Sequence, residues 1–276
     1  MNYRHAFHAG NHADVFKHAA LTFVLEWLAQ KPAPFAVLDT HAGVGVYDLA
    51  SEGAQRTREF EGGVGRVFEP GLASAPGYSA LLRAMNPGGL TTYPGSPEIV
   101  RRSLRGQDRL IACELHPDDA AALRARYRGD PRIAVHHRDG YEAIGALLPP
   151  KERRGLVLID PPYEQTDEAE RLAAALAVGL RRWANGTFMA WYPIKDGLIG
   201  AALARAAIAG GFPKTLQAEF SPFERDGVRL AGGGLLIVNA PWKLDERLAA
   251  LGVELSGRLG EGRAGWSVAP LTGDLS

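Results

Sequence analysis

The sequence predicts an α/β fold built on a mainly parallel, seven-stranded sheet. Seven strand-like apolar runs alternate with helical patterns along most of the 276 residues, as in a doubly wound sheet. The run at 156–160 is apolar up to its final acid, which is typical of a strand buried on both faces of a parallel sheet. The last two runs are joined by a segment too short for a crossover helix, so we expect an antiparallel final hairpin.

The strands are expected in a regular order along the chain. They are Phe35–Asp39, Arg109–Glu114, Arg132–His136, Leu156–Asp160, Thr187–Trp191, Lys214–Phe220 and Gly234–Asn239. Helices are expected near 12–29, 97–105, 117–127, 140–148, 167–184, 195–210 and 242–251.

Two of the helices have recognisable first turns. In the first helix, apolar residues four apart mark one face, namely Val15, Ala19, Phe23 and Trp27. Asn11 stands where its side chain can cap that helix. Ser96 is expected to cap the second helix, with Pro97 at its first position.

Residues 46–95 interrupt the alternation. They contain Gly-Gly and Pro-Gly pairs and only short helical patterns such as Tyr78–Met85. A structureless loop of this length is uncommon inside a compact domain. We therefore expect a small helical insertion after the first strand, within a single domain that spans residues 1–276.

Composition excludes several classes of protein. The formal net charge is zero, so a nucleic-acid substrate requires a local basic face. The single cysteine, Cys113, excludes an internal disulfide and a cysteine-rich zinc site. No apolar stretch reaches about 18 residues, and Met1–His5 is too polar for a signal peptide. We expect a cytoplasmic protein without membrane contact.

The most informative motif is Asp160-Pro161-Pro162-Tyr163, directly after a buried strand. The two prolines stiffen the turn and lack an N–H donor. The Asp160 carboxylate and the Pro161 carbonyl can each accept an N–H from an amino group on a flat ring, while Tyr163 stacks on that ring. The alternative is an ordinary strand exit with a capping aspartate.

Polar residues follow four successive predicted strands. The first strand leads into a glycine turn at 39–45, where a ligand can approach the backbone closely. Glu114 ends the second strand and can accept hydrogen bonds from both hydroxyls of a ribose. Asp139 follows the third strand and can accept from an adenine amino group, and Asp160 ends the fourth. Taken singly, each acid is equally well explained as a solvated or helix-capping carboxylate.

The amino-terminal segment 3–18 holds four of the eight histidines. One interpretation is a metal site at His8 and His12, four residues apart. Another is an ordered arm that packs on the sheet. Basic groups such as Arg4 and Lys17 can hold phosphates, although scattered basic residues are usually solvated surface.

The motifs together resemble a known family. The tetrapeptide at 160–163 is the signature of amino-group methyltransferases, and the four strand ends are similar to those of class I S-adenosylmethionine-dependent methyltransferases, which are Rossmann-like. Residues 3–18 closely resemble the amino-terminal box of the bacterial 23S rRNA (adenine-2030-N6)-methyltransferase family, RlmJ. The further matching segments are 38–43, 93–97, 114–117, 191–193 and 239–243.

The resemblance implies a function and a set of site residues. The S-adenosylmethionine site would be lined by His18, His41, Ser96, Glu114, Asp139, Gly140 and Asp160. Asp160 would be the catalytic group, and the substrate adenosine would meet Tyr3, Lys17, Pro161 and Tyr163. The family implies 23S rRNA that is protein-free or early in assembly, an arm at 1–18 that closes the site, a monomer without an obligate protein partner, and no metal. Two departures from the family pattern, Val44 and Ala240, leave this chemistry untouched.

Competing functions share part of this pattern. A DNA adenine or protein glutamine methyltransferase has the same tetrapeptide logic but lacks the amino-terminal box. A nicotinamide oxidoreductase has no need of the tetrapeptide. A catalytically silent RNA-binding relative would not need the intact Asp160.

Overall fold

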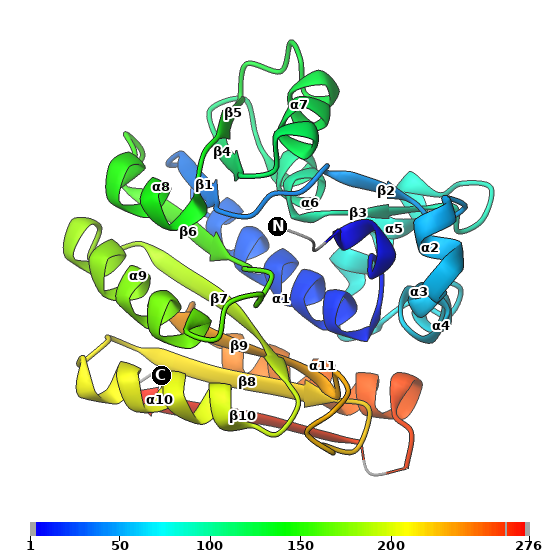
Figure 1. Ribbon diagram of the computed structural model, residues 1–276. Helices are drawn as coiled ribbons and strands as arrows, with labels where there is room; N and C mark the ends of the chain where they lie inside the picture. The colour runs from blue at the N-terminus through cyan, green and yellow to red at the C-terminus, as the bar shows by residue number, and fades with distance from the viewer. Residues whose placement is uncertain (1–3, 263, 274–276) are drawn as a thin grey trace.

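The computed structural model describes residues 4–262 and 264–273 and shows helices on both faces of a twisted sheet (Figure 1). The strand order in the described residues is β10-β8-β9-β7-β6-β1-β4-β5. Strands β5, β4, β1, β6 and β7 are parallel. Strand β9 runs antiparallel to both β7 and β8, so the expected antiparallel final hairpin is confirmed.

All seven expected strands are present. They are β1 (Phe35–Asp39), β4 (Arg109–Glu114), β5 (Ile133–His137), β6 (Arg154–Ile159), β7 (Thr187–Ile194), β8 (Thr215–Ser221) and β9 (Gly232–Val238). The first two match the expected bounds, and the others agree to within three residues at either end.

The expectation of seven strands is wrong by one, because β10 (Gly265–Thr272) adds an antiparallel edge to β8. Pro270 lies inside this strand, and the pairing with β8 is irregular between Pro270 and Thr272. Proline cannot donate to a ladder and is confined to edge strands and bulges. Pro270 therefore fits the edge position of β10, and it is also the residue that makes this segment difficult to recognise as a strand from the sequence.

The helices of the layered part are close to those expected, except that the last one ends eight residues beyond its expected end at 251. They are α1 (His12–Ala29), α6 (Ser96–Ser103), α7 (Pro117–Arg126), α8 (Gly140–Leu147), α9 (Glu168–Arg182), α10 (Leu198–Ala209) and α11 (Leu244–Leu259). The Asn11 side chain accepts the Asp14 N–H, so this cap is confirmed. The expected Ser96 cap is wrong: Ser96 is already helical, and Gly95 is the capping residue. Pro97 does lie in the first turn.

Two apolar layers enclose the sheet. On β6, Leu156 and Leu158 face the layer that contains α1 and α11, whereas Val157 and Ile159 face the layer of α8, α9 and α10. Helix α1 is buried on more than the single face that its periodicity indicates, since every residue from 12 to 25 is buried. Further helices cover the side of α1 that faces away from the sheet (Figure 1).

Those further helices come from residues 46–95. The segment contains α2 (Glu52–Thr57), α3 (Glu59–Gly62), α4 (Val64–Phe68) and α5 (Pro76–Met85), with a small antiparallel sheet of β2 (Val46–Asp48) and β3 (Thr92–Pro94). A short 3-10 helix, His5–Phe7, precedes α1 and contacts α2. No helix in the described ranges is long and apolar enough to span a membrane.

Candidate active site

A cavity of about 550 Å³ opens at the carboxyl ends of β1, β4 and β6. In the sheet order, β1 lies between β6 and β4, and ligands of open α/β sheets bind at such strand ends. The cavity wall includes most of the expected site residues, namely Lys17, His18, His41, Ser96, Glu114, Asp160, Pro161 and Tyr163. Segments far apart in the chain therefore meet at one place, as their positions after successive strands predict.

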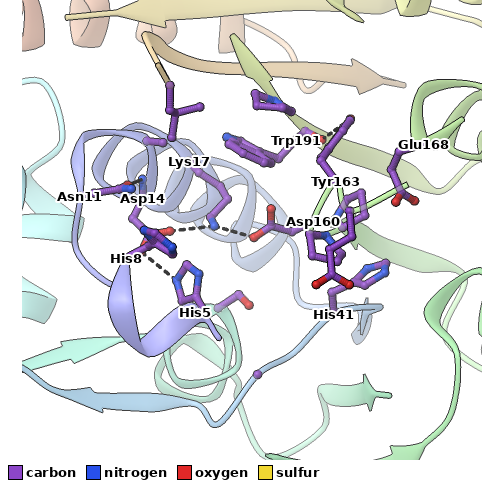
Figure 2. A pocket seen from close by; sticks show the side chains of 18 of the residues that line it. His5, His8, Asn11, Asp14, Lys17, His41, Asp160, Tyr163, Glu168 and Trp191 are labelled. Carbon is purple, nitrogen blue, oxygen red and sulfur yellow. Dashed lines mark hydrogen bonds and ion pairs between the residues drawn. The ribbon is translucent and has the colours of Figure 1, made fainter. Parts of the chain in front are cut away.

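Lys17 lies at the centre of a chain of charges (Figure 2). Its Nζ donates to Asp160 Oδ2 at 2.5 Å and is 2.8 Å from Asp14 Oδ1. Asp14 is one helical turn earlier on α1, whereas Asp160 follows β6. Asp160 thus has one oxygen held by a cation, and among the described residues no group is bonded to the other.

Asp14 is buried and has further donors. Its Oδ2 accepts the Gly10 N–H at 2.9 Å and lies 3.0 Å from His5 Nε2. Burial alone would raise the pKa of Asp14, but the charges of His5 and Lys17 hold it well below its usual value. Burial likewise opposes the charge on Lys17, yet Asp14 and Asp160 raise its pKa. Both groups are therefore charged over the physiological range.

The turn after Asp160 is fastened to the next strand. The Tyr163 hydroxyl donates to the Trp191 carbonyl on β7 at 3.1 Å, and the two rings meet edge to face with centroids 5.8 Å apart. The backbone of Tyr163 has a φ of 52°, in the left-handed region that non-glycine residues seldom adopt. This fastening keeps an aromatic ring beside the Asp160 carboxylate (Figure 2).

Glu114 ties the glycine turn to the end of β4. Its two oxygens accept the N–H groups of Gly43 and His116, each at 2.8 Å. A carboxylate has about four lone-pair sites, so two remain for ligand hydroxyls. The φ of 61° at Gly43 suits glycine, and an added Cβ would meet the Tyr47 hydroxyl at 2.2 Å.

His18 and His41, the two cavity histidines expected at the cofactor site, are neutral near pH 7. Burial lowers the pKa of His18 to about 3 and that of His41 to about 4. His18 Nδ1 lies 2.9 Å from the Tyr93 hydroxyl, and His41 Nδ1 lies 2.7 Å from Thr40 Oγ1. Each ring is thereby held through one nitrogen.

The remaining expected site residues lie elsewhere. Asp139 caps α8, where its side chain accepts the N–H groups of Tyr141 and Glu142, and it is outside the cavity wall. Gly140 is also outside the wall and packs so closely that an added Cβ would meet the Thr40 carbonyl oxygen at 2.3 Å. Tyr3 lies outside the described residues.

His8 and His12, considered above as metal ligands, have different neighbours. His8 Nδ1 is 2.9 Å from Glu59 Oε1, on the insertion. His12 packs edge to face on Phe223, with ring centroids 5.2 Å apart. Within the described ranges, no group of three or more metal-ligating side chains is found.

Comparison with known proteins places this geometry in a family. A family model described as "Ribosomal RNA large subunit methyltransferase D, RlmJ" matches residues 32–272. The chain belongs to this family. It is 40% identical to the Ribosomal RNA large subunit methyltransferase J of Escherichia coli (strain K12) over 252 residues, 90% of each chain. It is 38% identical to the protein of the same name from Haemophilus influenzae over 278 residues, 99% of each chain.

The fold expected from the resemblance is also confirmed. A crystal structure of a Legionella pneumophila protein matches with a TM-score of 0.88 and 31% identity, covering 95% of this chain and 98% of that one. The mostly parallel sheet with its antiparallel final hairpin is the Rossmann-like arrangement of this methyltransferase class.

Three residues of the site escaped the sequence interpretation. Asp14 and His5 lie in the amino-terminal box, but nothing in their spacing shows that His5 contacts Asp14 while Asp14 pairs with Lys17. The three-residue spacing of Asp14 and Lys17 on a helix was the available signal. Trp191 lies in the segment 191–193 that resembles the family, and only the fold shows that its ring lies 5.8 Å from Lys17 Nζ.

Proposed function

We propose that this protein transfers a methyl group from S-adenosylmethionine to N6 of an adenine in large-subunit ribosomal RNA, namely adenine 2030 of 23S rRNA by family resemblance. The observation that carries the proposal is the Asp160 carboxylate. It is held by Lys17, flanked by Tyr163, and located in a cavity that Glu114 also lines. The relatives named above as rRNA methyltransferases align over 90% or more of the chain.

The residues present fit the proposed cofactor. Glu114 has lone pairs left for ribose hydroxyls, and the glycine turn lets a ligand approach the backbone. We assign His18, His41 and Ser96, which line the same cavity, to the methionine end. Asp139 and Gly140 remain part of the proposal for the adenine end, although Asp139 would then have to accept beyond its two capping bonds.

When bound, S-adenosylmethionine supplies an electrophilic methyl group, and this chain supplies the placement of the nucleophile. The free Asp160 oxygen and the Pro161 carbonyl accept the two N6 hydrogens, which turns the nitrogen lone pair toward the methyl carbon. N6 would receive the methyl group, and Asp160 would accept the proton that N6 then releases. Lys17 fixes the direction of the carboxylate. Tyr163 and Tyr3 would stack on the adenine, which must be turned out of any helix.

The proposed substrate also bears on the stage of ribosome assembly and the compartment in which the reaction takes place. We propose that the RNA is protein-free or an early assembly intermediate, because a base has to leave its stack to enter a cavity at these strand ends. Because the proposed substrate is rRNA, we propose that the enzyme acts in the cytoplasm. We further propose, from the family resemblance, that the enzyme acts as a monomer.

One assay tests the substrate and the atom together. Tritiated S-adenosylmethionine is incubated separately with protein-free 23S rRNA, assembled subunits, DNA and a protein mixture, and labelled products are analysed as nucleosides or amino acids. We expect label in N6-methyladenosine from 23S rRNA alone, and none with Asp160→Asn. Label in DNA or in glutamine would replace the proposal by one of the competing methyltransferase functions.

A further inference from the structure

His18 and His41, two of the four histidines that line the cavity, are held in a way that specifies which ring nitrogen carries the hydrogen. Each has its Nδ1 bonded to a protein hydroxyl. Among the described residues, no group is hydrogen-bonded to the Nε2 of either ring, so Nε2 is the atom left for a ligand. A neutral imidazole has one donor and one acceptor nitrogen. The partner of Nδ1 therefore decides whether Nε2 donates or accepts.

On the His18 side, a chain of hydroxyls ends inside the insertion. Tyr93 Oη lies 2.9 Å from His18 Nδ1 and 3.0 Å from Tyr78 Oη. Both tyrosines are fully buried. Tyr78 Oη has no other hydrogen-bond partner in the described ranges, so its hydrogen must point to Tyr93. The Tyr93 hydrogen then points to His18 Nδ1, because the reverse direction leaves a buried hydroxyl hydrogen without an acceptor. His18 consequently carries its hydrogen on Nε2.

On the His41 side, the hydroxyl is directed away from the ring. Thr40 Oγ1 donates to the Leu158 carbonyl at 3.0 Å and lies 2.7 Å from His41 Nδ1. A hydroxyl has a single hydrogen, and this one is directed to the Leu158 carbonyl, which also accepts the Thr40 N–H at 3.0 Å. The Thr40 oxygen must then accept from His41, which carries its hydrogen on Nδ1. His41 Nε2 is a lone-pair acceptor.

We propose that three positioning residues, Tyr78, Tyr93 and Thr40, hold His18 and His41 in opposite tautomers. The cavity then recognises both the carboxylate and the ammonium group of an α-amino acid. His18 donates to the ligand carboxylate, and His41 accepts from the ligand ammonium. The low pKa of each ring is consistent with this arrangement, since a protonated imidazole would donate from both nitrogens. The assignment rests on the proposed use of S-adenosylmethionine, whose methionine end carries both groups.

The tautomers are measurable without any ligand or activity. In protein labelled with 15N-histidine, long-range 1H–15N correlation spectra at pH 7 distinguish protonated from unprotonated ring nitrogens. We expect His18 to be protonated on Nε2 and His41 on Nδ1. The same tautomer for both rings would overturn the proposal.

Two tyrosine variants test the relay. Tyr93→Phe removes the hydroxyl that donates to His18 Nδ1. Tyr78→Phe removes the hydroxyl that donates to Tyr93 and thereby fixes the direction of the Tyr93 hydrogen. In each variant, the other tautomer of His18 should appear. The dissociation constant of S-adenosylhomocysteine should then rise in inverse proportion to the fraction of molecules that still carry the His18 hydrogen on Nε2, which is about twofold when the two tautomers are equally populated. Affinity for 5′-methylthioadenosine, which lacks the amino-acid end, should not change. Unchanged tautomer and affinity in both variants would refute the relay.

Tyr192→Phe is the matched control. Tyr192 is also fully buried and its hydroxyl has two partners, Glu219 and Gln217, but it belongs to the opposite apolar layer and is outside the cavity wall. It should leave the His18 tautomer and both affinities unchanged. If the wild-type protein binds neither nucleoside, the proposed function fails, whereas the spectra of the free protein still decide the tautomers.

Discussion

Replacing Lys17 by methionine should destabilise the protein strongly, because it leaves a buried carboxylate short of its cation. Lys17 is 4% exposed and Asp14 is 2% exposed. Breaking a buried ion pair from one side costs about 3–5 kcal/mol. Asp14 keeps His5 and the Gly10 N–H as partners in Lys17→Met. We therefore expect the free energy of unfolding to fall by about 3 kcal/mol, the lower end of that range. At roughly 2–4 °C per kcal/mol for a chain of this size, the melting temperature should fall by roughly 6–12 °C.

The control and the second variant separate charge from packing. Lys151→Met removes an exposed lysine and should leave the melting temperature unchanged. The double variant Asp14→Asn, Lys17→Met carries neither charge and should recover most of the lost stability, which a double-mutant cycle reports as a coupling energy. Methyl transfer should stay reduced on the order of 10²-fold in the single and the double variant, because Asp160 has lost the group that orients it. Additive losses, or a melting temperature for Lys17→Met within about 2 °C of wild type, would refute this account of the ion pair.

Three further predictions concern catalysis, ligand binding and pH. Asp160→Asn should bind S-adenosylhomocysteine nearly as well as wild type by calorimetry while turnover falls by about 10²–10⁴; wild-type turnover would remove Asp160 from the mechanism. Glu114→Ala should raise the dissociation constant of S-adenosylhomocysteine at least about tenfold, and Glu114→Gln by less, because the amide retains one acceptor oxygen; equal affinities in all three proteins would place the ribose elsewhere. Burial lowers the pKa of His12 and of His41 to about 4 and that of His18 to about 3, so the stability they contribute is present above their unfolded pKa of about 6.5 and is lost as pH falls. Burial raises the pKa of Asp39 to about 7, which has the opposite sign over this range, so a net of two protons should lower the free energy of unfolding by about 2.7 kcal/mol per pH unit between pH 6 and about 4.5. Urea unfolding at three pH values measures this slope, and Asp39→Asn should raise it by about half, because the net then becomes three protons; a flat profile would contradict the buried neutral histidines.

The strands and the first helix were readable from the sequence because their signals are local. Residues 156–159 form a short apolar run that is typical of a strand buried on both faces, and the bounds of α1 follow from the Asn11 cap and the apolar spacing. The edge strand β10 was not readable, because Pro270 and the exposure of this strand to solvent weaken the apolar pattern that marks a buried strand. The role of Ser96 also needed the fold, since a cap and a first-turn residue differ by one position in the chain.

The sequence by itself determined the kinds of group at the site and the strand ends that present them, because parallel strands bring their carboxyl ends to one edge. The tertiary structure alone decided which of these groups touch. Lys17 and Asp160 are 143 residues apart, and no periodicity links them. The same holds for His18 and Tyr93, 75 residues apart, whose contact sets the donor and acceptor roles of a ring. Charge pairing and hydrogen-bond direction depend on positions within a few tenths of an ångström, and only the packed chain provides that precision.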